Sequence, residues 1–288
     1  MSREPSALYI MGAGRSGTTV MAALLAASPD VVAPGELHQL PDHVRGRENC
    51  GCGMPLSKCP KWGEYTAVIS CIGEEAYAER AEHFHRHGMI WRYFVSGKFA
   101  RDSKYQRGET TVFRTLEQDR NLVVDSSKYI GRALALSRVE ALDLRFLYMV
   151  RDPRGVVESF GKKVQTSRGP LSATLYYLVV NLTAEVVART LLRGRVMKVR
   201  FEDLAERPEE TLARLGRFVD RDLSPTSDAI RQGRDVAVGH LVGGNRLRSR
   251  TRISFSRQVT WPKTMGRSTR FFVWLATLPL NIVNRYRL

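Results

Sequence analysis

The most constraining feature of this sequence is a short apolar run that ends in a glycine-rich loop and continues directly into a helical pattern. Residues 7–11 read as a buried strand, residues 12–17 spell GAGRSG, and apolar residues recur at helical spacing from Val20 to Leu25. Glycines let backbone N–H groups approach an anion closely, and the helix N-terminus adds positive potential there. The pattern predicts a phosphate-binding loop between a strand and a helix, and hence an α/β fold.

Further strand-like runs occur along the chain with helical stretches between them. They lie at residues 31–33, 121–125, 144–150 and 196–201. Such spacing implies crossover connections, which predict a mostly parallel β-sheet flanked by α-helices on both faces. We expect residues 1–288 to form a single domain. A Cys-, Gly- and Pro-rich insertion is expected around 42–72, and an apolar C-terminal helix around 268–285.

The loop departs from the pattern of nucleotide triphosphatases at one position. The spacing from Gly12 to Gly17 is that of a Walker A loop, but Thr18 stands where the lysine should follow. That lysine reaches the β- and γ-phosphates in ATPases, so its absence argues against triphosphate chemistry. An anionic ligand remains expected, because the chain carries a net charge of +16 with a pI near 10.1.

The loop resembles the 5′-phosphosulfate loop of the PAPS-dependent sulfotransferase superfamily, in its bacterial or carbohydrate-type members. The resemblance implies a P-loop-like sulfotransferase fold, with 3′-phosphoadenosine-5′-phosphosulfate (PAPS) as co-substrate and no metal requirement. It also implies in-line transfer of a sulfuryl group to a hydroxyl of a carbohydrate, glycolipid or lipid-like acceptor. Carried over to this chain, Arg15 would stabilise charge on the bridging oxygen as the sulfuryl group leaves. The residues that the resemblance places around the 5′-phosphate are Gly14, Arg15, Ser16, Gly17, Thr18 and Thr19.

A second anion site is suggested after the run at 144–150. Asp152 suits a helix N-cap and Pro153 the first helical turn, so Arg151 lies at the strand end. Taken alone, these residues describe a capped helix with a surface arginine. Beside the first loop, their spacing is similar to the family's 3′-phosphate site, which implies that Arg151 and Ser159 bind that phosphate.

A third segment, residues 240–248, contains a glycine pair and two arginines. It resembles the late loop that closes over the nucleotide in carbohydrate-type members of the family. The resemblance implies that Gly244 and Arg248 contribute to donor binding. A basic surface loop is the alternative that its composition allows.

Three residues at predicted strand ends are candidates for acid–base or charge-stabilising roles. Glu36 follows the run at 31–33, and several carbohydrate sulfotransferases resemble this chain in having a glutamate there. His38 is the rival base, because the hormone-type enzymes of the family use a histidine further along the chain. Whichever residue is the base must lie close to the acceptor hydroxyl whose proton it takes. Lys128 follows the run at 121–125, where it could neutralise sulfuryl oxygens or orient the acceptor; a surface lysine is its alternative.

The four cysteines lie close together in the sequence. The C-x-C-x₆-C spacing of Cys50, Cys52 and Cys59 is not a standard zinc pattern, and no well-spaced histidine follows it. We therefore expect these thiols and Cys71 to be free or locally bridged, with a structural metal as the less favoured alternative.

Location and partners follow from weaker signals. No signal-sequence pattern precedes residue 7, and no apolar run approaches the roughly 20 residues of a spanning helix. We expect a cytoplasmic location, with Phe271–Val283 either packed on the domain or in peripheral contact with an anionic membrane. The rival functions are a P-loop small-molecule kinase and a non-enzymatic nucleic-acid-binding protein. No nucleic-acid partner is expected, because no recognised binding motif occurs.

Overall fold

The centre of the structure is a parallel five-stranded sheet. The computed structural model describes residues 4–73, 75–117, 121–162, 167–237, 240–243, 252–253, 255 and 261–288. The sheet consists of β1 (Ser6–Gly12), β2 (Val31–Gly35), β3 (Leu122–Lys128), β4 (Asp143–Val150) and β5 (Val196–Arg200). Its order is β2-β3-β1-β4-β5, and every neighbouring pair is parallel. The predicted parallel α/β sheet is confirmed.

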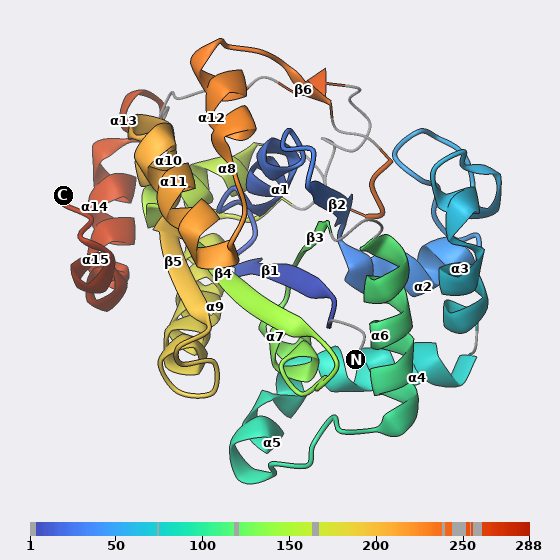
Figure 1. Cartoon of the computed structure of the whole chain (residues 1–288). Coiled ribbons are helices and arrows are strands. Elements are labelled where there is room, and N and C mark those ends of the chain that lie inside the picture. Colours follow the sequence, from blue (N-terminus) through green and yellow to red (C-terminus); the bar gives the residue numbers. More distant parts are fainter. Residues whose placement is uncertain are drawn as a thin grey trace.

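Helices cover both faces of this sheet (Figure 1), as predicted. One face carries α6 (Ser103–Leu116), α7 (Ile130–Leu136) and α9 (Pro170–Arg189). The other face carries α1 (Thr18–Leu25), α10 (Phe201–Glu206), α11 (Pro208–Val219) and α12 (Ser224–Arg231). Side chains of β1 alternate between the two cores, since successive residues of a strand point to opposite faces.

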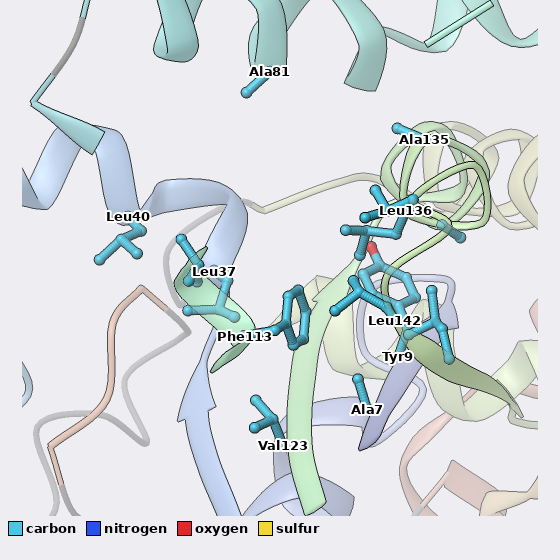
Figure 2. Packing of buried hydrophobic residues seen from close by; sticks show 14 of the residues in the cluster. Ala7, Tyr9, Leu37, Leu40, Ala81, Phe113, Val123, Ala135, Leu136 and Leu142 are labelled. Atoms are coloured by element: carbon cyan, nitrogen blue, oxygen red, sulfur yellow. The ribbon is translucent and has the colours of Figure 1, made fainter. Parts of the chain in front are cut away.

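The larger core is built on the face to which Ala7 and Tyr9 point. Figure 2 shows Tyr9 and Leu142 packed close to Leu136 of α7, with Phe113 of α6 nearby. Leu8 and Ile10 point to the opposite core, and β1 is therefore buried on both faces. Full burial contributes about 1.5–3 kcal/mol for each large apolar side chain, so the central strand is firmly held.

A third apolar cluster joins the C-terminal segment to the domain. Here α14 (Arg267–Ala276) and α15 (Leu278–Asn284) bury Val273 and Leu280 against α8 (Pro153–Gly161) and α9. The sequence suggested one helix at 268–285, but the structure has two. Pro279 lacks the backbone N–H that a continuing helix requires, and it lies instead in the first turn of α15.

The remaining elements are short. Residues 37–73 contain η1 (Leu37–Gln39), α2 (Leu40–Val44), η2 (Leu56–Lys58), η3 (Trp62–Tyr65) and α3 (Thr66–Ile72). They are followed by α4 (Glu75–His85), η4 (His87–Met89) and α5 (Ile90–Val95), and near the C-terminus lies α13 (Trp261–Thr264). Strands β6 (Val236–Ala237) and β7 (Arg252–Ile253) form a separate antiparallel pair. The interpretation of residues 1–288 as a single domain remains a prediction.

Within the described ranges one helix, α9, has the length and apolar composition of a membrane span, a candidate that the sequence analysis did not single out. In α9, 39% of the apolar window is buried within the protein. Ala173, Tyr177, Ala184 and Val187 form part of this buried side. A helix that packs on a sheet buries one side and exposes the other, as α9 does. We therefore interpret α9 as a helix packed on the sheet.

The strand order reverses beside β1, and this reversal positions the functional site. The chain places β2 and β3 on one side of β1, and β4 and β5 on the other. In open α/β sheets, ligands bind in the crevice outside the carboxyl ends of the strands at such a reversal.

Candidate active site

A pocket of about 940 Å³ lies at the carboxyl ends of four strands. The glycine-rich loop follows β1, Glu36 follows β2, Lys128 ends β3 and Arg151 follows β4. Of the residues singled out in the sequence, those that line this pocket are Gly14, Arg15, Gly17, Thr18, Thr19, Glu36, Lys128, Arg151 and Ser159. The fold thus brings together side chains that are widely separated in the sequence.

The glycine-rich loop has a shape that only glycine permits at two positions. Gly12 has φ +148°, and a Cβ there would lie 2.3 Å from the carbonyl oxygen of Met149. Gly17 has φ +90°, and its Cβ would lie 2.5 Å from the ring of Phe201. The backbone can therefore fold tightly over β4 and open its N–H groups toward the pocket.

Polar groups of this loop fit an anionic ligand. Ser16 is fully buried, and its Oγ finds no hydrogen-bond partner within the described ranges. A buried polar atom without a partner is costly, and a phosphate oxygen could satisfy it. Thr18 and Thr19 lie in the first turn of α1, where the helix dipole also favours negative charge. The loop is steadied from outside by the Gly14 N–H, which donates to the Tyr176 hydroxyl at 2.9 Å.

Arg151 contacts the same loop. Its Nη1 donates to the carbonyl oxygen of Arg15 at 3.1 Å, and its guanidinium lies 4.6 Å from the centre of the Phe201 ring. Burial lowers the pKa of Arg151 from its usual value, with Glu202 acting in the opposite direction. The absence of a side chain at Gly155 leaves room for the guanidinium, because a Cβ would lie 3.0 Å from Arg151 Nε.

The helix that carries Ser159 begins as the sequence predicted. Asp152 is the N-cap of α8 and accepts a hydrogen bond from the Arg154 N–H at 2.9 Å, while Pro153 occupies the first turn. The backbone N–H of Asp152 donates to Glu202 at 2.9 Å, and the Tyr286 hydroxyl donates to the same carboxylate at 3.1 Å. Burial raises the pKa of Glu202. These contacts connect the strand end of Arg151 to the C-terminal residues.

Glu36 and Lys128 form an ion pair inside the pocket. The Lys128 ammonium donates to Glu36 Oε1, and Gln39 donates to Oε2 at 3.3 Å. The Glu36 side chain is 3% exposed and that of Lys128 is 24% exposed. Lys128 reaches this position from a left-handed backbone conformation, φ 63°, where the register between β1 and β3 shifts. A carboxylate and an ammonium therefore meet beside the glycine-rich loop.

His38 lies in a neighbouring pocket of about 390 Å³. Its ring meets Tyr129 edge-on at 4.5 Å, and Tyr129 and His87 line both pockets. Burial, together with the charges of Lys128 and Arg132, holds the pKa of His38 well below its usual range. The structure thus separates the two candidate bases, with only Glu36 in the larger pocket.

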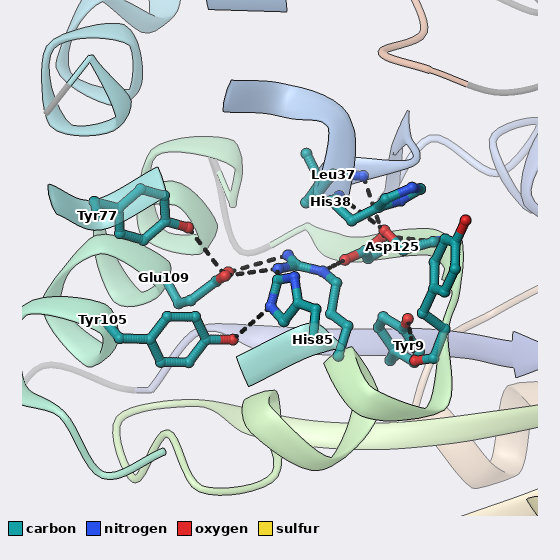
Figure 3. Close-up of polar contacts among 11 residues, drawn as sticks. Tyr9, Leu37, His38, Tyr77, His85, Tyr105, Glu109 and Asp125 are labelled. Atoms are coloured by element: carbon teal, nitrogen blue, oxygen red, sulfur yellow. Dashed lines mark hydrogen bonds and ion pairs between the residues drawn. The ribbon is translucent and has the colours of Figure 1, made fainter. Parts of the chain in front are cut away.

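A buried ionic network lies beneath the two strand ends (Figure 3). Arg132 donates to Asp125 at 2.9 Å and to both oxygens of Glu109, at 2.6 and 3.0 Å. Asp125 in turn accepts from the Ser127 N–H at 2.9 Å and from the Leu37 N–H at 3.3 Å. The network therefore links α6 and α7 to the segments that carry Glu36 and Lys128.

Sequence reasoning missed several residues of the pocket. Gln39, Phe160, Arg168, Tyr176 and Phe201 also line it. The guanidinium of Arg168 lies 4.9 Å from the Tyr176 ring centre, so it adds a further cation to the pocket. Arg168 precedes α9 and carries no local motif. Only its charge, shared with many other residues of this basic chain, could have pointed to it.

The late segment reaches the site through its described residues. Gly244 and Arg248 lie outside the described residues. Just before them, the Val242 N–H donates to the carbonyl oxygen of Pro34 at 2.8 Å, and the Glu36 N–H donates to that of Val242 at 2.7 Å. Residues 240–243 therefore lie directly against the strand end that carries Glu36.

A histidine that is distant in sequence lies beside three of the cysteines. No histidine follows the cysteines at motif spacing, but the fold brings His240 to Cys50, Cys52 and Cys59, with all ligand atoms within 4.8 Å of one another. His240 is distant in sequence, so spacing rules could not find it. Cys71 is not part of this group.

Comparison with solved structures agrees with the fold. A sulfotransferase domain from the curacin biosynthetic pathway shares 21% identity and a TM-score of 0.56, covering 100% of both chains. A sulfotransferase domain from the olefin synthase of Synechococcus PCC 7002 shares 20% identity and a TM-score of 0.59, covering 100% of this chain and 97% of that one. Sulfotransferase STF9 from Mycobacterium avium shares 12% identity and a TM-score of 0.51, covering 98% and 77%. These similarities show the fold.

Comparison of the sequence with protein families gives the assignment. A search of curated proteins found no match. The model of the sulfotransferase family matches residues 6–225, which include the glycine-rich loop, Glu36, Lys128 and Arg151. The chain belongs to the sulfotransferase family and is a sulfotransferase enzyme.

Proposed function

We propose that this enzyme transfers a sulfuryl group from PAPS to a hydroxyl of a carbohydrate, glycolipid or lipid-like acceptor. The observation that carries the proposal is the convergence of Arg15, Lys128, Arg151 and Arg168 on one pocket beside a glycine-rich loop. PAPS carries a phosphosulfate at one end and a 3′-phosphate at the other. Two separate groups of donors are therefore needed, and the pocket offers two.

The loop end of the pocket suits the 5′-phosphosulfate. The first turn of α1 and Arg15 supply donors at this end, and the buried Ser16 hydroxyl lies between them in the same loop. Arg151 and Ser159 are supplied by a different strand end and helix. A guanidinium can grip a phosphate with two parallel hydrogen bonds, which suits Arg151 to the 3′-phosphate.

The transfer step is an in-line displacement at sulfur. The acceptor oxygen forms a bond to sulfur as the bond between sulfur and the bridging oxygen of the 5′-phosphate breaks. The leaving group, adenosine 3′,5′-bisphosphate (PAP), takes the electron pair, and Arg15 stabilises the charge that develops there. Lys128 is suited to the sulfuryl oxygens.

Glu36 is the base that we assign to this step. It lines the same pocket as the loop, where its carboxylate contacts the Lys128 ammonium and is placed to accept the hydroxyl proton. His38 is neutral because its pKa is low, but it faces the neighbouring pocket. Its position beside Tyr129, shared by both pockets, suits it to contact with the acceptor rather than with the donor.

A lipid-like acceptor is supported by exposed apolar side chains on α9 and α14. Leu175 and Val179 of α9 are exposed, as are Phe271 and Leu275 of α14, and the chain is strongly basic. Apolar side chains combined with positive charge favour peripheral contact of a cytoplasmic protein with an anionic membrane. In a flotation assay, anionic vesicles should carry the protein and zwitterionic vesicles should not. Equal recovery with both, or with neither, counts against this contact.

The reaction itself is tested by incubating the enzyme with radiolabelled PAPS and separate panels of carbohydrates, glycolipids and hydroxylated lipids. We expect label to move to at least one panel with release of an equal amount of PAP. Transfer of phosphate from ATP–Mg²⁺ in its place would favour a kinase and refute the proposal. Labelling of none of the three panels would refute the acceptor class, while PAP release alone would retain the donor.

A further inference from the structure

A group of metal-ligand side chains lies outside the active site. Cys50, Cys52 and Cys59 belong to the segment between α2 and α3, and His240 comes from the segment after β6. Cys50 and Cys59 are buried, His240 is partly exposed and Cys52 is exposed. Three thiols and one imidazole nitrogen make a complete donor set for one tetrahedral ion. The proposed reaction uses none of them, so the question of their role is independent of the proposed function.

The sulfur–sulfur distances from Cys59 match those of a tetrahedral zinc site, and the two sulfur–nitrogen distances lie on either side of the expected value. With Zn–S bonds of about 2.3 Å and Zn–N bonds of about 2.0–2.1 Å, tetrahedral angles place two sulfurs about 3.8 Å apart and sulfur about 3.6 Å from nitrogen. The Cys59 sulfur lies 3.7 Å from that of Cys50 and 3.8 Å from that of Cys52. Nδ1 of His240 lies 3.1 Å from the Cys59 sulfur and 4.0 Å from the Cys50 sulfur.

A disulfide does not account for this arrangement. A disulfide bond is about 2.05 Å long and joins only two sulfurs. Here the sulfur of Cys59 is nearly equidistant from the other two thiols and faces the imidazole as well. Convergence of all four ligand atoms on one point is the property that a metal ion explains and that a single bridge between two cysteines leaves unexplained.

The backbone around the ligands is fixed by its own hydrogen bonds. Cys50 and Met54 form a tight turn, in which the Cys50 N–H donates to the Met54 carbonyl oxygen at 2.9 Å and the Gly53 N–H donates to that of Cys50 at 2.8 Å. Gly53 has φ +87°, a conformation that favours glycine. The turn holds Cys50 and Cys52 at one side of the loop, so little ordering remains to be done when a metal binds.

Two further bonds hold the histidine segment against the cysteine segment. The buried Trp62 indole donates from Nε1 to the carbonyl oxygen of His240 at 2.9 Å, and the Gly51 N–H donates to that of Leu241 at 2.9 Å. The next residue, Val242, pairs with the strand end that carries Glu36. An ion at this point would therefore fix the segment on which the position of Glu36 depends.

We infer that Cys50, Cys52, Cys59 and His240 form a structural zinc site. The thiolate-rich donor set selects zinc among the common divalent ions, and four protein ligands fill its tetrahedral coordination without an open position for a substrate. His240 ligates through Nδ1, so its proton lies on Nε2. The site fastens the residue 240–243 segment to the cysteine segment.

The test measures metal in the full chain, purified without chelators from zinc-supplemented cells. We expect about one zinc per chain in the wild type and in the matched control Cys71→Ser. Because Cys52 is exposed, Cys52→Ser should fold normally but lower the affinity for zinc by more than the roughly 10- to 100-fold typical of outer-shell substitutions. Cobalt added to the metal-free wild type should give the absorption of a tetrahedral thiolate complex, reduced in Cys52→Ser.

Several results would overturn the inference. One is wild-type protein that contains no zinc and binds neither zinc nor cobalt. Another is zinc retained with unchanged affinity in both Cys52→Ser and His240→Ala. A third is a mass that reveals a disulfide among Cys50, Cys52 and Cys59 in protein kept under reducing conditions until analysis. A melting temperature that falls on metal removal in the wild type and Cys71→Ser would support the structural role.

Discussion

Replacement of Arg132 by methionine tests whether the buried ionic network supports the active site. Arg132 is 2% exposed, and its partners Glu109 and Asp125 are both fully buried. Arg132→Met keeps much of the side-chain volume but leaves two carboxylates in the core without their cation. Removing one partner of a buried ion pair costs about 3–5 kcal/mol. Since whole domains are stable by only about 5–15 kcal/mol, this is a large fraction of the folding free energy.

The assay is urea unfolding followed by circular dichroism, with Arg231→Met as matched control. Arg231 pairs with Asp228 at the surface, where its side chain is 64% exposed. Such pairs contribute about 0–1 kcal/mol, so the control should lose little stability. Asp125 also accepts from the Leu37 N–H beside Glu36, so Arg132→Met should in addition lower kcat. A loss below about 1 kcal/mol, equal to that of the control, would refute the reasoning.

Three further results follow from the geometry. Glu36→Gln should lower kcat by about 10²- to 10⁴-fold, since it removes the proton acceptor as well as the negative charge beside Lys128; an unchanged kcat in steady-state assays would exclude Glu36 as the base. Gly17→Ala should cost about 1–2 kcal/mol for its left-handed backbone and weaken PAP binding by displacing the Phe201 ring; calorimetry showing wild-type affinity would contradict this. Burial holds the pKa of His38 and His85 well below 6.5, so the unfolded state binds more protons than the folded state below that pH. As the pH falls, the free energy of unfolding should therefore decrease by up to about 1.4 kcal/mol per pH unit for each histidine. Melting curves between pH 8 and 5 check this, and His38→Gln should lessen the slope; a stability that rises as the pH falls would be the opposite result.

The fold was predictable because local patterns and topology rules agree. Each strand of the sheet was visible as a short apolar run, and the helical stretches between them required parallel pairing. Parallel pairing then places the strand ends that carry Gly14, Glu36, Lys128 and Arg151 at one edge of the sheet. Residues that follow strands can therefore be grouped into one site from the sequence alone.

What could not be predicted depends on contacts between distant segments. Arg168 lines the pocket because its N–H donates to the carbonyl oxygen of Phe160 in α8 at 3.4 Å, and no local pattern marks it. Arg132 sits on a helix that reads as apolar, and its two carboxylate partners come from different elements. His240 joins cysteines that lie far away in sequence, so no spacing rule applies to it. The periodicity of apolar residues describes single helices and strands, and it does not predict contacts between distant segments.

The central claim is that Arg151 recognises the 3′-phosphate of the donor, and the most direct measurement compares the affinities of PAP and AMP by calorimetry. In the wild type, PAP should bind more tightly by about 1.5–3 kcal/mol, or roughly 10- to 150-fold, for each charge-assisted hydrogen bond to that phosphate. In Arg151→Ala this difference should largely disappear, because the affinity for PAP falls much more than that for AMP, which has no 3′-phosphate. Equal affinities in the wild type, or a difference that persists in Arg151→Ala, would contradict the assignment of the donor site.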